Sequence, residues 1–256
     1  MVEDLMQRFF LEIAYDGTAY HGWQLQDNAV TVQQRLNEAL QKIIRLPVET
    51  VGAGRTDTGV HAKQLFVHLD VPASRIPDGG RFLHSLNALL PPDIAVKRLL
   101  PVNAGAHARF DAIERAYEYH IHFEKNPFLV HRSWQLRDRP NVEEMNRAAA
   151  YLLGTQDFGC FSKSHTQVFT NICSVKKAVW EAQAEGLVFH IAADRFLRNM
   201  VRAIVGTLLE IGLKQKAPET ICDIIRSKDR AQAGTSVPAH GLYLTKVVYP
   251  YISELP

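Results

Sequence analysis

The sequence has few cysteines and no long hydrophobic run, and both absences limit what the protein can be. Its three cysteines, Cys160, Cys173 and Cys222, match neither a CxxC pair nor a zinc pattern. An odd count argues against a disulfide framework and favours a reducing compartment. The N-terminal segment carries acidic residues early and lacks a long apolar stretch, which predicts neither a signal peptide nor a membrane span. We therefore expect a cytoplasmic protein.

A large excess of charge is also absent. The chain has 29 Lys and Arg against 27 Asp and Glu, for a net charge of +2. This is weak evidence for nucleic-acid binding, because strongly basic binders carry a larger excess, so what matters is whether the positive charges cluster. With 256 residues, 46% of them hydrophobic and 22% charged, the chain is an ordinary globular protein of one large or two small domains.

The predicted elements follow the order β-α-β-β-α-β, and this order occurs twice. In the first half, strands are predicted at 9–15, 48–52, 64–71 and 94–99, with helices after an N-cap at Thr31 and at 81–90. In the second half, strands are predicted at 115–123, 172–180, 187–193 and 241–249, with helices at 141–153, 195–211 and 218–226. We expect an α+β fold of two ferredoxin-like halves, residues 1–104 and 105–256, whose mainly antiparallel sheets meet at a central cleft.

The stretch that carries chemistry reads GAGRTDTGVHA, residues 52–62. Its glycines allow the backbone to turn and to approach a ligand closely. It is not a dinucleotide-binding fingerprint, because Asp57 stands where the third glycine would be, and no Gly-Lys-Ser/Thr follows as in a P-loop. On an extended segment Arg55 and Asp57 point to the same side, and the guanidinium favours an ionised carboxylate, as a nucleophile or base requires. An isolated Arg-x-Asp is usually a structural pair in a turn, but the surrounding glycines and polar residues favour a functional site.

Two further segments offer candidate binding residues. The strand at 115–123 has an aromatic face on which Tyr117 could stack a flipped base, whereas Tyr119 and Phe123 are more typical of a core. The helix predicted at 195–211 carries a polar stripe at the spacing i, i+3, i+4, i+7. The stripe consists of Arg195, Arg198, Asn199 and Arg202. Such stripes are usually solvated helix faces. His120 and His122 alternate with apolar residues, which predicts a solvent or edge position, and no third ligand is spaced to complete a zinc site.

The motif at 52–62 resembles the catalytic motif of the tRNA pseudouridine synthase A family, with Asp57 in the place of the essential aspartate. Further segments resemble that family in the same order along nearly the whole chain. These segments are 15–24, 108–119, 157–161, 196–202 and 240–242. The resemblance implies isomerisation of uridine to pseudouridine at positions 38, 39 and 40 of the tRNA anticodon stem-loop. Whether Asp57 attacks C6, attacks C1′ or removes a sugar proton stays open at this point.

The resemblance also assigns roles to particular residues. It implies that Arg55 and Tyr117 bind the substrate, that Arg198 keeps the catalytic carboxylate ionised, and that Leu242 closes the pocket, although Leu242 alone would indicate plain core. Arg195 and Arg202 are implied as RNA contacts. The N-terminal half would carry the catalytic loop and the C-terminal half the stacking tyrosine and the arginine helix, with the cleft between them as the catalytic site. The resemblance further implies no metal or organic cofactor and a homodimer that holds tRNA across both subunits.

Two other functions are compatible with parts of the sequence. A non-catalytic RNA-binding protein of two ferredoxin-like halves would be expected to carry an RNP-type aromatic pattern, which is missing, and a pocketed Asp57 would repel phosphate. An aspartyl phosphotransferase built on Asp57-Thr58-Gly59 would need magnesium ligands, and no paired carboxylate lies near Asp57 in the sequence. The synthase interpretation is favoured over both.

Overall fold

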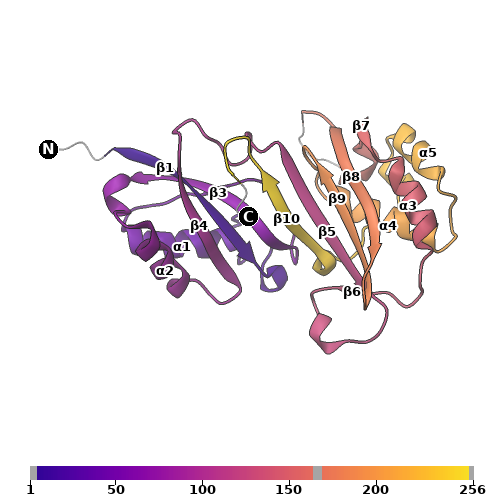
Figure 1. Cartoon of the computed structure of the whole chain (residues 1–256), viewed down its shortest axis with the longest axis horizontal. Helices are drawn as coiled ribbons and strands as arrows, with labels where there is room; N and C mark the ends of the chain where they lie inside the picture. The colour runs from indigo at the N-terminus through magenta and orange to yellow at the C-terminus, as the bar shows by residue number, and fades with distance from the viewer. Residues whose placement is uncertain (1–4, 164–168, 254–256) are drawn as a thin grey trace. The chain divides into compact units, whose positions relative to one another are not determined.

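The computed structural model describes residues 5–163 and 169–253 and has the predicted α+β composition, with mostly antiparallel strands (Figure 1). The chain divides into two compact units. The first comprises the described residues up to Ile113 together with those from Leu244 onward, and the second comprises Glu114–Tyr243. No helix in the described ranges is long and apolar enough to cross a membrane.

The units do not coincide with the halves predicted at 1–104 and 105–256, because both the 105–113 segment and the C-terminal segment pack with the first unit. The backbone N–H of Ile113 donates to the carbonyl of Val248 at 2.9 Å. The hydroxyl of Tyr249 donates to the carbonyl of Ala108 at 2.5 Å. Pairing of a sequence-distant segment is set by tertiary contacts, which local patterns do not report.

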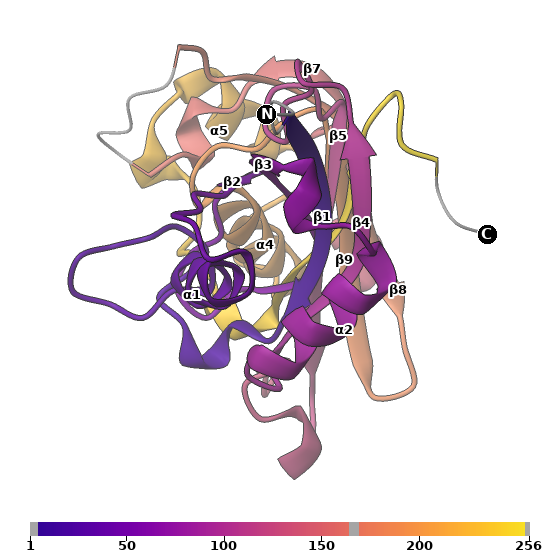
Figure 2. The ribbon, with the colours of Figure 1, turned by 90° about the vertical axis from the view of Figure 1, so that its left-hand side faces the viewer.

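The first unit is an antiparallel sheet in the order β4-β1-β3, with β2 and β10 along the other edge of β3. Its elements are β1 (Met6–Tyr15), α1 (Val32–Ile44), β2 (Val51–Gly52), β3 (His61–Pro72), α2 (Gly79–Leu89), β4 (Ile94–Val102) and, from Leu244 onward, β10 (Leu242–Val248). Both helices lie on the same side of these strands (Figure 2). The strands and helices predicted in this part of the chain are thereby confirmed, although β2 is only two residues long.

Strand β1 is buried on both faces. Phe10 and Leu11 point to opposite faces of the strand, and neither is exposed at all. The helices α1 and α2 cover one side of the sheet. The rings of Tyr249 and Tyr251 pack edge-on against Phe10, with centroids 5.3 and 6.3 Å away. The C-terminal segment therefore supplies part of the core of the first unit.

The N-cap predicted for α1 is confirmed, but only half of the predicted capping box forms. The hydroxyl of Thr31 accepts a hydrogen bond from the backbone N–H of Gln34 at 3.3 Å. The Gln34 side chain does not reach back toward Thr31 in this arrangement but donates to Glu38 at 2.9 Å. An i,i+4 pair on the helix surface has replaced the second hydrogen bond of the box.

The second unit is an antiparallel sheet in the order β5-β9-β8-β7, with the short β6 parallel to β5. Its elements are β5 (Glu114–His122), β6 (Trp134–Gln135), α3 (Val142–Ala150), β7 (Gly154–Asp157), β8 (Ile172–Ala182), β9 (Gly186–Ala193), α4 (Met200–Gly212) and α5 (Thr220–Ser227). α3 packs against α4 and β8. The hairpin predicted between β8 and β9 is confirmed.

The helix predicted at 195–211 was wrong at its start. α4 begins at Met200, because Asn199 has a left-handed backbone with φ 66° that a helix does not accommodate. The carboxylate of Asp194 accepts hydrogen bonds from the backbone N–H groups of Ser174 and Arg195, both at 2.7 Å, and holds the preceding segment in a turn. Of the four stripe residues, only Arg202 lies on the helix.

His122 was also placed wrongly, since it is buried and not at the solvent or an edge. Its Nδ1 is hydrogen-bonded to the hydroxyl of Ser133 at 3.0 Å, so the polar ring has a partner inside the unit. His120 is half-buried and contacts Glu118 at 3.0 Å. In the described part of the chain, no group of three or more His, Cys, Asp or Glu could hold a metal ion.

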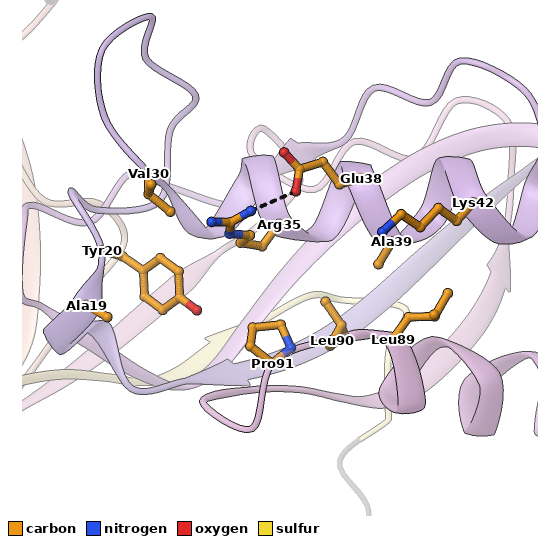
Figure 3. A pocket seen from close by; sticks show the side chains of 10 residues that line it. All are labelled: Ala19, Tyr20, Val30, Arg35, Glu38, Ala39, Lys42, Leu89, Leu90 and Pro91. Carbon is orange, nitrogen blue, oxygen red and sulfur yellow. Dashed lines mark hydrogen bonds and ion pairs between the residues drawn. The ribbon is translucent and has the colours of Figure 1, made fainter.

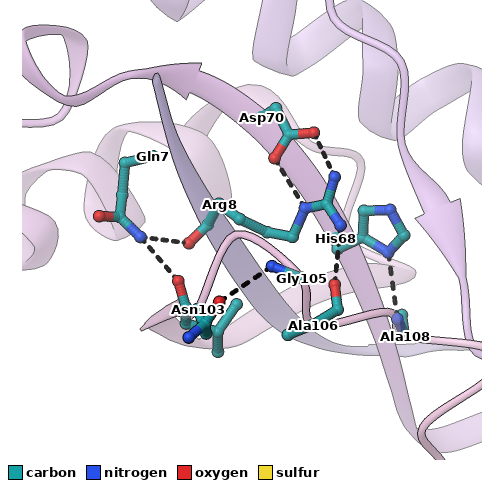
Figure 4. Close-up of polar contacts among 9 residues, drawn as sticks. Gln7, Arg8, His68, Asp70, Asn103, Gly105, Ala106 and Ala108 are labelled. Carbon is teal, nitrogen blue, oxygen red and sulfur yellow. Dashed lines mark hydrogen bonds and ion pairs between the residues drawn. The ribbon is translucent and has the colours of Figure 1, made fainter. Parts of the chain in front are cut away.

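A loop at residues 103–111 follows β4 and is fastened to the sheet by polar contacts (Figure 4). The guanidinium of Arg8 donates hydrogen bonds to both carboxylate oxygens of Asp70, at 2.8 and 2.6 Å, and a third to the carbonyl of Ala106 at 2.9 Å. The ring of His68 accepts a hydrogen bond from the backbone N–H of Ala108 at 3.1 Å. Burial, with a smaller contribution from the Arg8 cation, lowers the pKa of His68 to about 4. His68 is therefore neutral and able to accept that bond at neutral pH.

We expect His68 to make folding stability fall as the pH drops from about 6.5 toward about 4. The unfolded chain protonates this histidine near pH 6.5, whereas the folded chain keeps it neutral until about pH 4. The unfolded state therefore binds the extra proton throughout this window, and this binding lowers its free energy relative to the folded state. Urea unfolding at pH 7 and pH 4.5 should show a smaller loss for His68→Asn, whose side-chain oxygen can accept the Ala108 bond, than for the wild type. An equal loss in both proteins would contradict the role given to His68.

Candidate active site

The loop that carries Asp57 leaves β2 and returns to β3 within a few residues. At its start the backbone N–H of Ala53 donates to the carbonyl of Phe66 on β3 at 2.8 Å. At its end the N–H of Val60 donates to the carbonyl of Asp57 at 3.1 Å, closing a turn. Gly59 lies inside this turn at φ 78°, a left-handed conformation that favours glycine. Asp57 is thus held in a tight, defined turn next to the sheet.

A second segment, residues 17–23, packs backbone to backbone against this loop. A Cβ atom on Gly17 would lie 2.0 Å from the carbonyl oxygen of Val60, and one on Gly22 would lie 2.3 Å from that of Thr56. The N–H of Trp23 donates to the same Thr56 carbonyl at 3.3 Å. These contacts require glycine at both positions. The Tyr-Asp-Gly-Thr segment, residues 15–18, therefore leads directly into backbone contacts with the Asp57 loop.

Side chains alternate between buried and accessible along the loop. Thr56 is buried, and its hydroxyl is hydrogen-bonded to that of Tyr15 at 2.8 Å. Asp57 is half-buried and Arg55 is exposed. A Cβ atom added at Gly54 would meet nothing within 4 Å. The loop is therefore anchored by Thr56 and leaves open space and a partly accessible carboxylate beside it, which suits a group that attacks or deprotonates a bound substrate.

His61 has a structural place in this arrangement. Its ring is buried, and Nδ1 accepts a hydrogen bond from the backbone N–H of Gly17 at 3.0 Å. The imidazole thereby fastens the start of β3 to the 17–23 segment.

In the second unit, Tyr117 lies on β5 and is half-buried, in contrast to Tyr119 on the same strand. The ring of Tyr117 meets that of Phe196 edge-on, with centroids 5.1 Å apart. Tyr119 is completely buried, and its hydroxyl donates to the carbonyl of Pro238 at 2.8 Å. Tyr119 is a core residue as expected, whereas Tyr117 is oriented by an aromatic neighbour and is partly accessible.

Arg195 and Arg198, which were predicted to lie on a helix, lie in the segment before α4. Arg198 is exposed, and its carbonyl accepts a hydrogen bond from the backbone N–H of Lys163 at 3.0 Å. Asn199 donates through its side chain to the hydroxyl of Ser236 at 2.5 Å. Arg202, on the helix itself, donates through Nε to the carbonyl of Val237 at 2.8 Å. A turn and not a helix face therefore sets the direction of Arg195 and Arg198.

Leu242 begins β10 and is buried, with 6% of its surface exposed. The preceding Gly241 lies against Tyr119, since a Cβ atom there would be 2.8 Å from its ring.

The thiols of Cys160 and Cys173 are buried as well, and burial raises the pKa of each to about 12. Both thiols are therefore neutral at physiological pH and unsuited to nucleophilic chemistry.

A cavity of about 560 Å³ opens elsewhere in the first unit, between α1, α2 and the 17–23 segment (Figure 3). Two of its lining residues, Arg35 and Glu38, form an ion pair at 3.0 Å, and the hydroxyl of the lining residue Tyr20 donates to Asp93, outside the lining, at 2.6 Å. One lining residue, Tyr20, contacts the Asp57 loop, because its carbonyl accepts a hydrogen bond from the N–H of Gly59 at 3.2 Å. The cavity contains none of the predicted site residues.

Comparison with known proteins defines the class. A family model described as tRNA pseudouridine synthase matches residues 148–250. Proteins named tRNA pseudouridine synthase A are similar over nearly the whole length. The one from Porphyromonas gingivalis is 50% identical over 247 residues, covering 96% of this chain and 98% of the relative. Those from Bacillus subtilis and Thermoanaerobacter sp. are 42% and 40% identical, covering 93% and 95% of this chain and 97% and 100% of the relatives. The protein is an isomerase that acts on uridine in tRNA.

The chain belongs to the tRNA pseudouridine synthase A family. A solved chain from Galdieria sulphuraria, titled as an unknown protein, aligns with a TM-score of 0.24 and 11% identity over 74% of this chain and 81% of that one. The TM-score is too low for that chain to inform the fold.

We expect Gly22→Ala to destabilise the protein and Gly54→Ala to leave its stability nearly unchanged. In the first variant the new methyl group collides with the carbonyl of Thr56 at a left-handed backbone position, and such overpacking costs about 2 kcal/mol. In the second it enters open space, and the free energy of unfolding should change by less than about 0.5 kcal/mol. Urea unfolding of both variants tests the packing of the 17–23 segment on the Asp57 loop. Equal stability of the two variants would contradict it.

Proposed function

We propose that the enzyme converts uridine to pseudouridine at positions 38, 39 and 40 of the tRNA anticodon stem-loop, with Asp57 as the catalytic nucleophile or base. The observation that carries this proposal is the Asp57 loop itself. Two glycines of a distant segment close tightly on its backbone, while the loop has open space at Gly54 and a half-buried carboxylate at Asp57. The resemblance of GAGRTDTGVHA to the family's catalytic motif supports the same assignment.

The reaction sets out what the site must provide. The C1′–N1 bond of uridine breaks, the uracil turns, and a C5–C1′ bond forms. The hydrogen on C5 leaves as a proton, and N1 gains one, so atoms and charge balance. No external oxidant or reductant is needed. One positioned carboxylate is enough to begin the exchange, whether at C6, at C1′ or at a sugar proton.

Further residues complete the proposed site. Tyr117 stacks the flipped base, since its ring is oriented by Phe196 and partly accessible. Arg55 and Arg198 are both exposed. Arg55 is assigned to substrate binding and Arg198 to the catalytic carboxylate, and the buried Leu242 supplies an apolar wall of the pocket. Arg195 and Arg202 are assigned to RNA phosphates. These roles rest on the family resemblance.

The strand order supports ferredoxin-like units. In the first unit the neighbouring strands are β1, β3 and β2, and α1 lies between β1 and β2 in the chain. In the second unit the neighbouring strands are β5, β9 and β8, and α3 lies between β5 and β8 in the chain.

We also propose a cytoplasmic homodimer that holds tRNA across both subunits, because two copies can line one cleft with basic patches despite a net charge of +2 per chain. Sedimentation at the mass of a single chain would exclude the dimer.

The proposed chemistry predicts that Asp57→Asn abolishes tritium release from tRNA labelled at C5 of uridine. The substitution is nearly isosteric at a half-buried position, so the fold and tRNA binding should persist while the carboxylate is lost. The assay compares wild type and variant without added metal. Release by the variant at the wild-type rate would mean that another carboxylate carries the reaction. No release from a folded wild type that binds tRNA would favour the non-catalytic RNA-binding function.

The stacking role of Tyr117 predicts a graded response in the same assay. Tyr117→Phe keeps the aromatic ring and should retain most of the activity, whereas Tyr117→Ala should lose most of it. Stacking of a base on an aromatic ring is worth about 1–3 kcal/mol, which corresponds to a loss of roughly five- to 150-fold. Equal losses in the two variants would show that the hydroxyl, and not the ring, carries the function.

A further inference from the structure

Phe110 is exposed in a loop that is otherwise held tightly in place. Its side chain has 73% of its surface exposed, although it lies in the 103–111 loop that Arg8 and His68 fasten to the sheet. Exposed phenylalanine is common on mobile segments, where it has no fixed position. Here the position is fixed, and burial in the core of the first unit does not explain the residue.

Every backbone amide from Gly105 to Asp111 has a hydrogen-bond partner. Asn103 accepts the amides of residues 105 and 106, at 3.0 and 2.9 Å. His107 accepts the amides of residues 109 and 110 at its ring Nδ1, at 3.1 and 3.3 Å, and that of Asp111 at its carbonyl, at 3.1 Å.

The two remaining amides of the loop bind side chains. The carboxylate of Asp111 accepts the amide of His107 at 2.8 Å and also the hydroxyl of Tyr251 at 2.7 Å. The ring of His68 accepts the amide of Ala108. Because no amide of this stretch lacks a partner, the loop is a rigid platform and not a disordered tip.

The ring of Phe110 is also oriented by its neighbours. The ring of His107 lies 4.2 Å from it, centroid to centroid, and the guanidinium of Arg109 lies 5.7 Å from its centroid. Burial lowers the pKa of His107, so this ring is neutral and its Nδ1 can accept the two amides. The platform therefore presents an aromatic ring beside a cation, with an exposed amide side chain at Asn103.

We propose that Phe110 and Arg109 form an RNA contact, in which the phenyl ring stacks an unpaired base and the guanidinium binds the backbone next to it. The proposal rests on the proposed function and deepens it by naming a contact with the tRNA substrate. An aromatic ring paired with a cation is the combination that binds single-stranded nucleic acid. A stable protein interface buries about 800 Å² of surface on each partner. Phe110 is instead a single apolar side chain, and its chain neighbours Arg109 and Asp111 are both charged.

This contact lies away from the reacting nucleotide. The Asp57 loop joins β3 at His61, and the 103–111 loop is attached to the same strand at His68. Seven residues of strand separate these two points, which is roughly 23 Å. Phe110 therefore contributes to holding the tRNA and not to the bond exchange.

The test measures tRNA binding and turnover in Phe110→Ala and in a matched control. Phe110→Ala should raise both the Kd for tRNA and the KM about tenfold, with kcat unchanged within about twofold. Phe110→Tyr, which keeps the ring, should behave like the wild type. Phe128→Ala removes an equally exposed phenylalanine, 83% exposed in the second unit, and should leave Kd and KM unchanged. Thermal unfolding of Phe110→Ala should match the wild type, because the bonds that fix the loop are made by other groups.

Three outcomes would overturn the proposal. An unchanged Kd in Phe110→Ala would show that the ring does not contact RNA. An equal rise in Phe128→Ala would indicate a general surface effect. A change in the sedimentation mass of Phe110→Ala would assign the ring to contact with a second copy of the chain. Failure of the proposed function is distinguishable from these, because it appears as absent tritium release from the wild type even where tRNA binds.

Discussion

The geometry of the Asp57 loop depends on the close approach of two backbones. The 17–23 segment lies so near the loop that no side chain larger than hydrogen fits at Gly17 or Gly22. The carboxylate is positioned by this contact, by the buried Thr56 hydroxyl and by the His61 ring, none of which needs to touch a substrate. Rigid support of this kind fixes a reactive group more closely than a loop held only at its ends.

The sequence predicted the elements of the first unit because their signals are local. The Thr31 cap, the helical spacing after it and the alternation along β3 each depend on neighbours within a few residues. The 52–62 motif was recognisable for the same reason. That the 17–23 segment packs on this motif could not be predicted from spacing, because the contacts join backbones 34 and 43 residues apart in the chain. The only sign of these contacts in the sequence is the glycine at each position.

The start of α4 shows how a periodic pattern can mislead. Arg195, Arg198, Asn199 and Arg202 have helical spacing, yet only the last is helical. Asp194 and Asn199 both favour local turns, by side-chain hydrogen bonding and by a left-handed backbone, and these preferences overrode the pattern. The difference matters for the candidate site because a turn can aim Arg198 independently of Arg202, whereas a helix face would couple them.

The packing of the C-terminal segment onto β1 bears on how the chain folds during synthesis. Tyr249 and Tyr251 cover a face of the sheet whose strands come from the first hundred residues. A ribosome therefore releases β1, β3 and β4 long before the rings that cover Phe10 are available. Until then the nascent sheet exposes aromatic surface, and the order of translation makes the first unit in sequence the last to be completed.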